Sequence, residues 1–364
     1  MRIDRSRLGR YGRATARWAR LVLPRRPTPG LRVFYGHDVV PAPGEPVAGG
    51  SAKFQRLARR WPNSPTDFSL LYLGSTWLPR DLRPLISLAQ RRRIPIVVNQ
   101  SGVAYPGWAG AETDAINRHF RQALLAADHV LYQSEFCKRS ADEFLGEPRG
   151  RWEVLYNVVD VDQFSPAGPP TASGPVLLLA GDQTQAYRLE VALRTLAQLP
   201  GARLIATGRL VSDPEPLLRE LGVGERVEFV GRYPQRDAPS LFRRAHLLLH
   251  TKVNDPCPTA VIEAMACGLP VVYAASGGTV ELVGDEAGIG VPHPESWERD
   301  EPPTPEAFAE AVRGVLSERD RYAAAGRLRV VERFALAPWL GRHAELFDEL
   351  VRGGAPRART SRTR

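Results

Sequence analysis

From residue 31 onward, short apolar runs alternate with longer amphipathic stretches. The runs LRVFYG, FSLLYLG, IPIVVNQ, DHVLYQS and WEVLYN have the length and composition of buried strands. Between them lie stretches of helical periodicity, such as AKFQRLARRW and RDLRPLISLAQRRR. Alternation of strand and helix predicts a parallel sheet with helices on both faces.

The alternation stops once and then resumes. The interrupting segment, NVVDVDQFSPAGPPTASGP, has no periodicity and is rich in Pro, Gly and Ser, as is typical of a linker. Further strands are predicted at PVLLLAG, ARLIATG, RVEFVG, HLLLHT and LPVVYA. We therefore expect two doubly wound, Rossmann-like α/β domains facing a cleft, with ligands bound beyond the carboxyl ends of the strands.

The pattern divides the chain into six parts. A length of 364 residues fits two domains, because single cores stop growing at roughly 250–300 residues. The last helix is expected to pack back on the first domain. The expected parts are a basic arm (1–30), a first domain (31–165), a linker (166–175), a second domain (176–335), a helix (336–351) and a basic tail (352–364).

The net charge of +9 lies at the two ends of the chain. Residues 1–30 carry +8 and residues 352–364 carry +5, which leaves −4 for the remaining body. This distribution argues against a nucleic-acid partner that binds the folded body. Basic arms of this kind bind anionic surfaces, including lipid head groups.

The first arm has the pattern of an amphipathic helix. Its apolar positions are Leu8, Tyr11, Trp18 and Val22, and Arg10, Arg13, Arg17 and Arg20 fall on the opposite face. Such a helix suits an anionic membrane interface. It equally suits a helix docked on the body with its arginine face in solvent, and the sequence leaves both interpretations open.

Several features predict a cytoplasmic protein, and the basic arms would allow a peripheral position at the inner membrane face. No apolar run approaches the ~18 residues of a membrane span, and the beginning of the chain does not read as a secretory signal. The three cysteines, Cys137, Cys257 and Cys267, are too scattered for a disulfide framework or a metal site. We expect reduced thiols.

The most informative segment is NDPCPTAVIEAMACG, at residues 254–268. Asp255 lies in the predicted loop after a strand, and Glu263 lies in the first turns of the helix that follows. A helix N-terminus that points into a crevice favours anions, and a carboxylate beside it can accept hydrogen bonds from a ribose diol. The alternative is a surface helix with ordinary acidic residues near its start.

This segment resembles the acidic-x7-Glu signature of glycosyltransferase family 4, including the sequence EAMACGLPVV that continues from Glu263. Four other segments resemble the family in order and spacing, so that the resemblance covers roughly residues 31–350. They are AGGSAKFQRLA, ADHVLYQSEFCKRSADEFLG, VLYNVVDVDQFSP and VEFVGRYPQRDAPSLFRRAHLLLH. The resemblance implies the two-domain GT-B fold and a retaining glycosyltransferase.

The resemblance also implies roles for the matched residues. Glu263 would hold the ribose hydroxyls, and Asp255 would touch hydroxyls of the donor sugar. The glycines of the first-domain loop would let its backbone approach the diphosphate. Further expected donor-site residues are Gly49 and Gly50 in that loop, Thr259, Ala260 and Val261 around sugar and phosphate, Arg232 and Tyr233 near the base, and Gln100, Asp182 and Cys257, at positions where this chain departs from the family.

Some positions depart from the family pattern. The loop acid is usually Glu, and the Phe-Gly after it is replaced by Cys257-Pro258. Two family cations that bind the diphosphate are replaced by Asp182 and Tyr187, which leaves Arg188 as the expected cation. A family His that contacts the donor sugar is replaced by Gln100, which can hydrogen-bond but carries no charge.

We therefore expect transfer of a hexose from a UDP- or GDP-sugar to a glycan or lipid-linked acceptor, in the synthesis of cell-surface polysaccharide or glycolipid. Asp255, Glu263 and Arg188 are the expected catalytic residues, and no metal or other cofactor is expected. Asp160-Val161-Asp162 matches a metal-binding DxD motif but falls in the linker. Alternatives are a degenerate glycosyltransferase-like binding protein, or another GT-B enzyme such as a sugar epimerase or phosphorylase.

Overall fold

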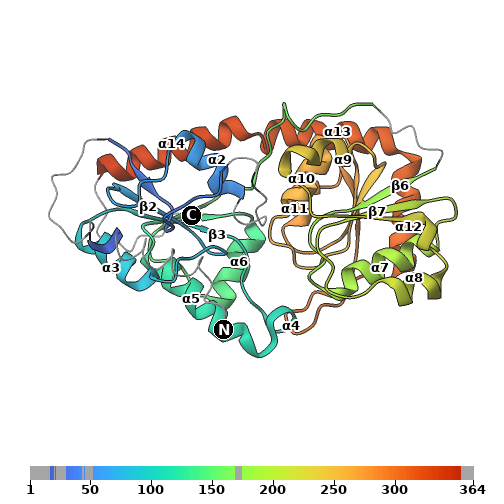
Figure 1. The fold of residues 1–364 in the computed structure, drawn as a ribbon, viewed down its shortest axis with the longest axis horizontal. Helices are drawn as coiled ribbons and strands as arrows, with labels where there is room; N and C mark the ends of the chain where they lie inside the picture. The colour runs from blue at the N-terminus through green and yellow to red at the C-terminus, as the bar shows by residue number, and fades with distance from the viewer. Residues whose placement is uncertain are drawn as a thin grey trace, which may run out of the picture.

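A computed structural model describes residues 17–19, 21, 30–42, 45, 52–168 and 174–353. Two parallel sheets lie side by side along the long axis of the molecule, each with helices on both faces (Figure 1). The expected fold class, two doubly wound α/β domains, is therefore confirmed. In the part of the chain that the structure describes, no helix is long and apolar enough to cross a membrane.

The first domain contains a five-stranded sheet of order β1-β2-β3-β4-β5. Its strands are β1 (Val33–Phe34), β2 (Leu70–Gly74), β3 (Ile96–Gln100), β4 (His129–Tyr132) and β5 (Arg151–Val154). Its helices are α2 (Ala52–Arg60), α3 (Leu82–Arg91), α4 (Pro106–Ala109), the 3-10 turn η2 (Gly110–Glu112), α5 (Thr113–Ala126) and α6 (Glu135–Phe144).

The second domain contains a six-stranded sheet of order β11-β10-β9-β6-β7-β8. Its strands are β6 (Val176–Leu179), β7 (Arg203–Thr207), β8 (Val227–Gly231), β9 (Leu247–His250), β10 (Val271–Ala274) and β11 (Gly288–Val291). Strand order reverses between β6 and β9, and the crevice at such a point is the usual ligand site of a doubly wound sheet.

Helices and short 3-10 turns connect the strands of the second domain and end the chain. They are α7 (Ala186–Ala197), α8 (Glu215–Leu221), η3 (Gly224–Arg226), η4 (Gln235–Asp237), α9 (Ala238–Phe242), α10 (Thr259–Ala266), α11 (Thr279–Val283), α12 (Pro305–Ser317), α13 (Arg319–Arg333) and α14 (Leu336–Gly353). Figure 1 shows α14 in red, running from the second domain across the first. Trp339, Leu346 and Phe347 of α14 pack in the core of the first domain.

The chain leaves the first domain earlier than the sequence pattern predicts. Val158 packs in the core of the first domain, whereas Val159 already packs in the core of the second. The two crossings between domains lie side by side: Val159 N donates to Phe334 O at 2.9 Å, and Leu336 N donates to Val159 O at 3.0 Å. The expected linker at 166–175 therefore follows the true crossing, and its residues 169–173 lie outside the described part.

The described residues of the first arm dock on the body. Leu21 is 1% exposed in the core of the first domain. Arg17 is 5% exposed and pairs with Asp38 at 2.9 Å and with Asp81, to which Trp18 Nε1 also donates at 2.7 Å. The pattern placed Arg17 on a solvated or membrane-facing surface, and this is wrong because two carboxylates hold it inside. The other arm positions lie outside the described residues.

Candidate active site

Asp255 and Glu263 lie at the switch point of the second sheet, where the sequence pattern placed them. β9 ends at His250, a loop carries Asp255, and α10 begins at Thr259. Because α10 starts beyond the carboxyl end of β9, its first turn lies at the switch point, where a helix N-terminus favours an anion; Val261 N donates to Pro258 O at 3.1 Å. Thr259, Ala260 and Val261 form this first turn.

Glu263 is a buried carboxylate with a neutral partner. It is 6% exposed, and its Oε1 accepts a hydrogen bond from Gln235 Nε2 at 2.6 Å. Burial raises the pKa of Glu263 to about 7, although the charge of Arg56 and the bond from Gln235 act in the opposite direction. Burial raises the pKa of the Tyr233 phenol, and the nearby charge of Glu263 raises it further. This end of the crevice thus combines Tyr233, Gln235 and Glu263.

Asp255 is held as a charged carboxylate. Its Oδ2 lies 3.3 Å from Lys252 Nζ and 3.4 Å from His250 Nε2. Burial by itself would raise the pKa of Asp255, but Lys252, His250 and Arg188 together outweigh burial and hold it well below its usual range. The ionised side chain can therefore accept hydrogen bonds from hydroxyl groups of a ligand.

Asp182 and Arg232 form a pair across the ends of β6 and β8. Arg232 Nε donates to Asp182 Oδ1 at 3.1 Å and its Nη2 also contacts the carboxylate, while Arg209 N donates to Oδ1 at 2.8 Å. The bonds from Arg232 lower the pKa of Asp182, although burial opposes them. Asp182 therefore fixes the loops after three strands, and Arg232 remains 62% exposed at the rim.

Arg188 differs from its expected role as an open cation for a diphosphate. It is 4% exposed, and its guanidinium donates to Asp182 O at 2.6 Å and Ala180 O at 3.2 Å. Because both carbonyl groups belong to the loop after β6, Arg188 fixes the conformation of that loop. Its positive charge also helps to lower the pKa of Asp255. The hydroxyl of Tyr187 accepts a hydrogen bond from Val253 N at 3.2 Å and holds the loop after β9.

The first domain contributes two cations that the sequence pattern did not single out. Lys53 of α2 is 4% exposed, and its Nζ donates to Asn99 Oδ1 at 2.5 Å. Arg56, one turn later, donates to Val158 O at 2.5 Å and interacts electrostatically with Glu263. Their spacing of three residues in the first turns of a helix was the available signal.

A polar network joins the two domains at the start of α10. Gln133 Nε2 donates to Asn99 Oδ1 at 2.6 Å, and Asn157 Nδ2 donates both to Gln133 Oε1 and to Cys257 O at 2.9 Å. Ser134 Oγ donates to Pro256 O at 2.7 Å. It also accepts from Cys137 N at 3.0 Å and so caps the N-terminus of α6. Cys257 thus contacts the first domain through its backbone.

Glycine permits the close approach of the domains at this point. A Cβ atom on Gly102 of the first domain would lie 2.6 Å from Pro256 Cγ of the second, and one on Gly278 of the second domain would lie 2.8 Å from Ser134 Oγ of the first. The carboxylate of Glu281, on α11, accepts hydrogen bonds from Glu135 N and Phe136 N at 2.8 Å each. The second domain therefore caps α6 of the first.

The remaining predicted positions are placed as follows. Gly49 and Gly50 lie outside the described residues. Gln100 is fully buried at the end of β3 and donates to Gly102 O at 2.9 Å, so it supports the loop that meets Pro256. Asp160, in the DxD sequence, accepts from the N–H groups of Asp162 and Gln163 and closes a local turn.

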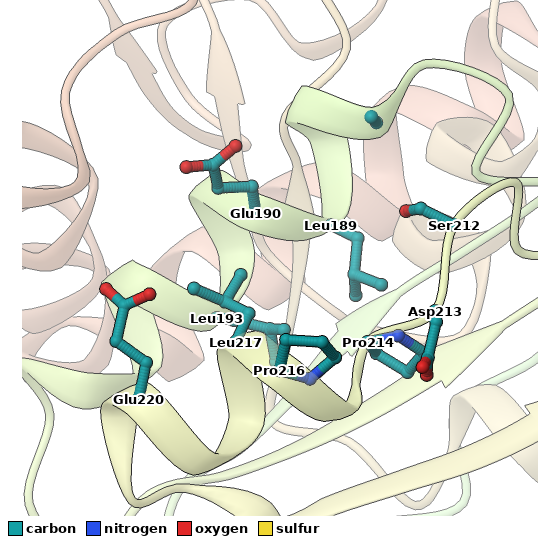
Figure 2. Close-up of a pocket in the computed structure, with 10 residues that line it drawn as sticks. Leu189, Glu190, Leu193, Ser212, Asp213, Pro214, Pro216, Leu217 and Glu220 are labelled. Atoms are coloured by element: carbon teal, nitrogen blue, oxygen red, sulfur yellow. The ribbon is translucent and has the colours of Figure 1, made fainter.

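Two hollows lie away from Glu263. A groove of about 270 Å³ lies between α7 and α8. Figure 2 shows Leu189, Leu193, Leu217 and Pro216 gathered there, with Glu190 and Glu220 to one side. A second cavity of about 340 Å³ lies at the domain boundary between α6 and residues 295–297. Its lining includes Phe136, Arg139, Trp297 and Asn254, the neighbour of Asp255.

Comparison with known proteins supports the sequence resemblance for the second domain. Residues 167–328 match the family model of glycosyl transferases group 1. The chain is 30% identical over 180 residues to the D-inositol 3-phosphate glycosyltransferases of Mycobacterium bovis (strain BCG / Pasteur 1173P2) and Mycobacterium tuberculosis (strain ATCC 25177 / H37Ra). The aligned part covers 45% of this chain and 38% of each relative.

Solved structures resemble both domains together. Sucrose-phosphate synthase from Thermosynechococcus elongatus superposes with a TM-score of 0.67 at 20% identity, covering 82% of this chain and 77% of that chain. The HepE protein of Anabaena in complex with UDP-glucose gives a TM-score of 0.64 at 20% identity, covering 82% of each chain. At this identity the likeness shows a shared fold, which is GT-B.

Proposed function

We propose that the protein transfers a sugar from a nucleoside diphosphate donor, on the premise that residues 167–328 match the family model of glycosyl transferases group 1. The observation that carries this proposal is the position of Glu263. A buried carboxylate with a single neutral hydrogen-bond partner, in the first turns of a helix at the switch point, suits a ribose diol.

We propose UDP or GDP as the nucleotide and a hexose as the sugar. The Anabaena protein HepE, which shares the fold, forms a complex with UDP-glucose, a donor of this class. In this chain, Tyr233 and Gln235 border Glu263, and the Asp182–Arg232 pair lies next along the strand ends. The base would lie beside Tyr233 and Arg232, with the diphosphate at the start of α10.

We propose that transfer retains the configuration of the sugar. The sugar would leave the diphosphate as an oxocarbenium-like species, and the acceptor hydroxyl would arrive on the same face. The departing phosphate can take the proton of the acceptor, so the residues need to position the reactants and stabilise negative charge. Asp255, fixed by Lys252 and His250, would accept hydrogen bonds from sugar hydroxyls. We propose that no metal is required.

We propose a glycan or lipid-linked acceptor, in the synthesis of cell-surface polysaccharide or glycolipid on the cytoplasmic side of the membrane. The arginines before residue 17 and after residue 351 would attract an anionic surface. Because Arg17 and Leu21 belong to the docked part, the informative variant lacks only residues 1–16. We expect it to bind anionic vesicles less tightly than the full chain, and unchanged binding would contradict a role for this arm.

A catalytically degenerate binding protein is the second candidate. The observation that favours it is the engagement of Asp182 and Tyr187, where the family has open cations, in contacts within the protein. A screen of nucleotide sugars by thermal shift tests both proposals, since a ligand that binds only the folded state raises the melting temperature. Stabilisation by one nucleotide sugar, followed by transfer to an acceptor, supports the enzyme. No stabilisation by any of them contradicts the nucleotide site, and binding without hydrolysis or transfer favours the degenerate form.

A further inference from the structure

Lysine is used at only three positions of this chain, although lysine and arginine together number 49. The three are Lys53, Lys138 and Lys252. Lys138 lies on α6, where it pairs with Asp142 and lies 4.7 Å from the centre of the Trp152 ring. Of the other two, Lys252 lies in the loop that leads into α10, and Lys53 of the first domain lies near Cys257 of that loop. A lysine ammonium is a compact charge with three donors, and it suits a phosphate group that must be approached from one direction.

Lys252 lies in the second domain, directly after β9. Its side chain is 26% exposed, and its Nζ lies 3.3 Å from Asp255 Oδ2. Its other donors can therefore serve a ligand that also reaches Asp255. Tyr187 holds the backbone of the next residue, Val253, and so fixes the position of Lys252.

Lys53 faces the same loop from the first domain. It is 4% exposed, and its Nζ donates a hydrogen bond to the amide oxygen of Asn99. Within the described residues it forms no ion pair, whereas Lys138 and Lys252 each do. Cys257 of the second domain lies near enough to interact with it electrostatically. A buried ammonium without a counter-ion is costly, and an anionic ligand would remove that cost.

The positions that carry cations in the resembling family are occupied differently here. Asp182 accepts from Arg209 N and pairs with Arg232, and Tyr187 contacts Val253 N. Arg188 is engaged with two carbonyl groups of its own loop. These three positions therefore leave the start of α10 without an open cation, while Lys53 and Lys252 border it.

We propose that Lys53 and Lys252 bind the diphosphate of the donor from opposite domains, in place of the two cations that the family carries at positions 182 and 187. This rests on the proposed function, and names the residues that neutralise its leaving group. Because one lysine belongs to each domain, the diphosphate would bridge them. Tight binding of the diphosphate would then require the closed arrangement in which Ser134 contacts Pro256 and Glu281 caps α6.

The test compares a nucleoside diphosphate with its nucleoside on the purified full chain. Isothermal titration measures the affinity for UDP or GDP, whichever the wild type binds, and competition measures the affinity for uridine or guanosine. Lys53→Gln keeps a donor for Asn99 and removes the charge, Lys252→Gln removes the charge beside Asp255, and Lys138→Gln is the matched control. We expect each cleft variant to lose about tenfold to hundredfold in diphosphate affinity, with nucleoside affinity within about twofold.

The proposal is overturned if the ratio of diphosphate affinity to nucleoside affinity stays at the wild-type value in Lys53→Gln or in Lys252→Gln. It is also overturned if Lys138→Gln loses as much diphosphate affinity as these two variants. If the wild type binds neither nucleotide, the proposed function itself fails. A second measurement uses only the wild type. Burial lowers the pKa of Lys53 to about 8. Cys257 and Cys137 raise this pKa, whereas Arg56 lowers it further, and His343 is also close enough to interact with Lys53. Diphosphate affinity should therefore fall relative to nucleoside affinity as pH rises from 8 to 9, and a constant ratio contradicts the part assigned to Lys53.

Discussion

The amide of Gln235 donates to the carboxylate of Glu263 at 2.6 Å, in a place where that carboxylate is almost completely buried. A neutral donor satisfies one oxygen without supplying a countercharge, so burial prevails and raises the pKa of Glu263 to about 7. Hydroxyl groups of a bound ribose would add donors to the charged form. Ligand binding and ionisation of Glu263 should therefore favour each other.

The first prediction concerns pH and the nucleoside. A ribose that donates to Glu263 binds its ionised form, which becomes dominant as pH rises through about 7. Affinity for uridine or guanosine should increase by about tenfold between pH 6 and pH 8, measured by competition against a labelled nucleotide. The nucleoside is used because it carries no phosphate that titrates. Glu263→Gln should remove this dependence, and a wild-type profile as flat as that of the variant would contradict the assigned contact.

The stability of the free protein should depend on pH in the opposite direction. Because the folded pKa of Glu263 lies above the ordinary value of 4.5, the folded state binds its proton more tightly. The stabilisation is complete below about 4.5 and is lost as pH rises through about 7. Thermal unfolding at pH 5 and pH 8 should therefore show a smaller loss of stability in Glu263→Gln than in wild type. Equal losses would indicate that other groups determine the dependence.

The second prediction separates Asp255 from Glu263. Asp255→Asn removes the charge that would meet the sugar while keeping the shape of the side chain. We expect turnover to fall by about tenfold to hundredfold, with the affinity for UDP or GDP changed by less than about threefold. A transfer assay and isothermal titration on the same preparations measure both. A loss of nucleotide affinity equal to that of Glu263→Gln would show that the two residues do not act on different parts of the donor.

The third prediction concerns Arg188 as a positioning residue. Arg188→Met leaves Ala180 O and Asp182 O without their donor in a buried place, at a cost of about 1–3 kcal/mol for each group. Thermal unfolding should show a clear loss of stability, whereas Arg194→Met, on the same helix but 37% exposed, should change little. If Arg188→Met abolished transfer at unchanged stability, the guanidinium would instead act on the substrate.

The fourth prediction concerns the cap between the domains. Glu281 accepts from two N–H groups of α6 and from Tyr156 Oη, at 2.8–3.0 Å. Glu281→Gln keeps one oxygen and loses the charge, so we expect a lower melting temperature and weaker diphosphate binding with nucleoside binding retained. Glu286→Gln, whose side chain is 66% exposed, is the control. If Glu281→Gln bound the diphosphate with unchanged affinity, diphosphate binding would not depend on this contact between the domains, and the prediction would be wrong.

Among the described residues, the hydrophobic pattern predicted ten of the eleven strands because most of them are short, buried apolar runs; β5 and β8 have no fully buried residue but keep apolar residues in sequence. β11, at Gly288–Val291, was missed. Its sequence, GIGV, has two glycines, which favour turns in isolation. Gly288 is required there because a Cβ atom would lie 1.9 Å from Val271 O of the neighbouring strand. Such a requirement arises only when the two strands pair.

The candidate site was predicted in its position and only partly in its chemistry. Asp255 and Glu263 follow from a local pattern, because a strand, a loop and a helix start bring them to one crevice. Arg188 is buried because it donates to the carbonyl of Ala180, a contact that forms only when the loop after β6 folds over it. Arg17 is buried because it pairs with Asp38, which is distant in sequence. The spacing of Lys53 and Arg56 places them on one face of a helix, but that this face meets the second domain depends on α2 packing beside the crossing at Val158.

The most direct measurement of the central claim is isothermal titration of UDP and GDP into the full chain and into Glu263→Ala. Glu225→Ala, which removes an exposed acidic side chain of the same domain, is the matched control. The wild type and the control should bind one of the two nucleotides. Glu263→Ala should bind that nucleotide about fivefold to hundredfold more weakly, as expected for a loss of about 1–3 kcal/mol in binding free energy. Equal affinity in Glu263→Ala and wild type, or binding of neither nucleotide by the wild type, would contradict the assignment of this crevice as the nucleotide site.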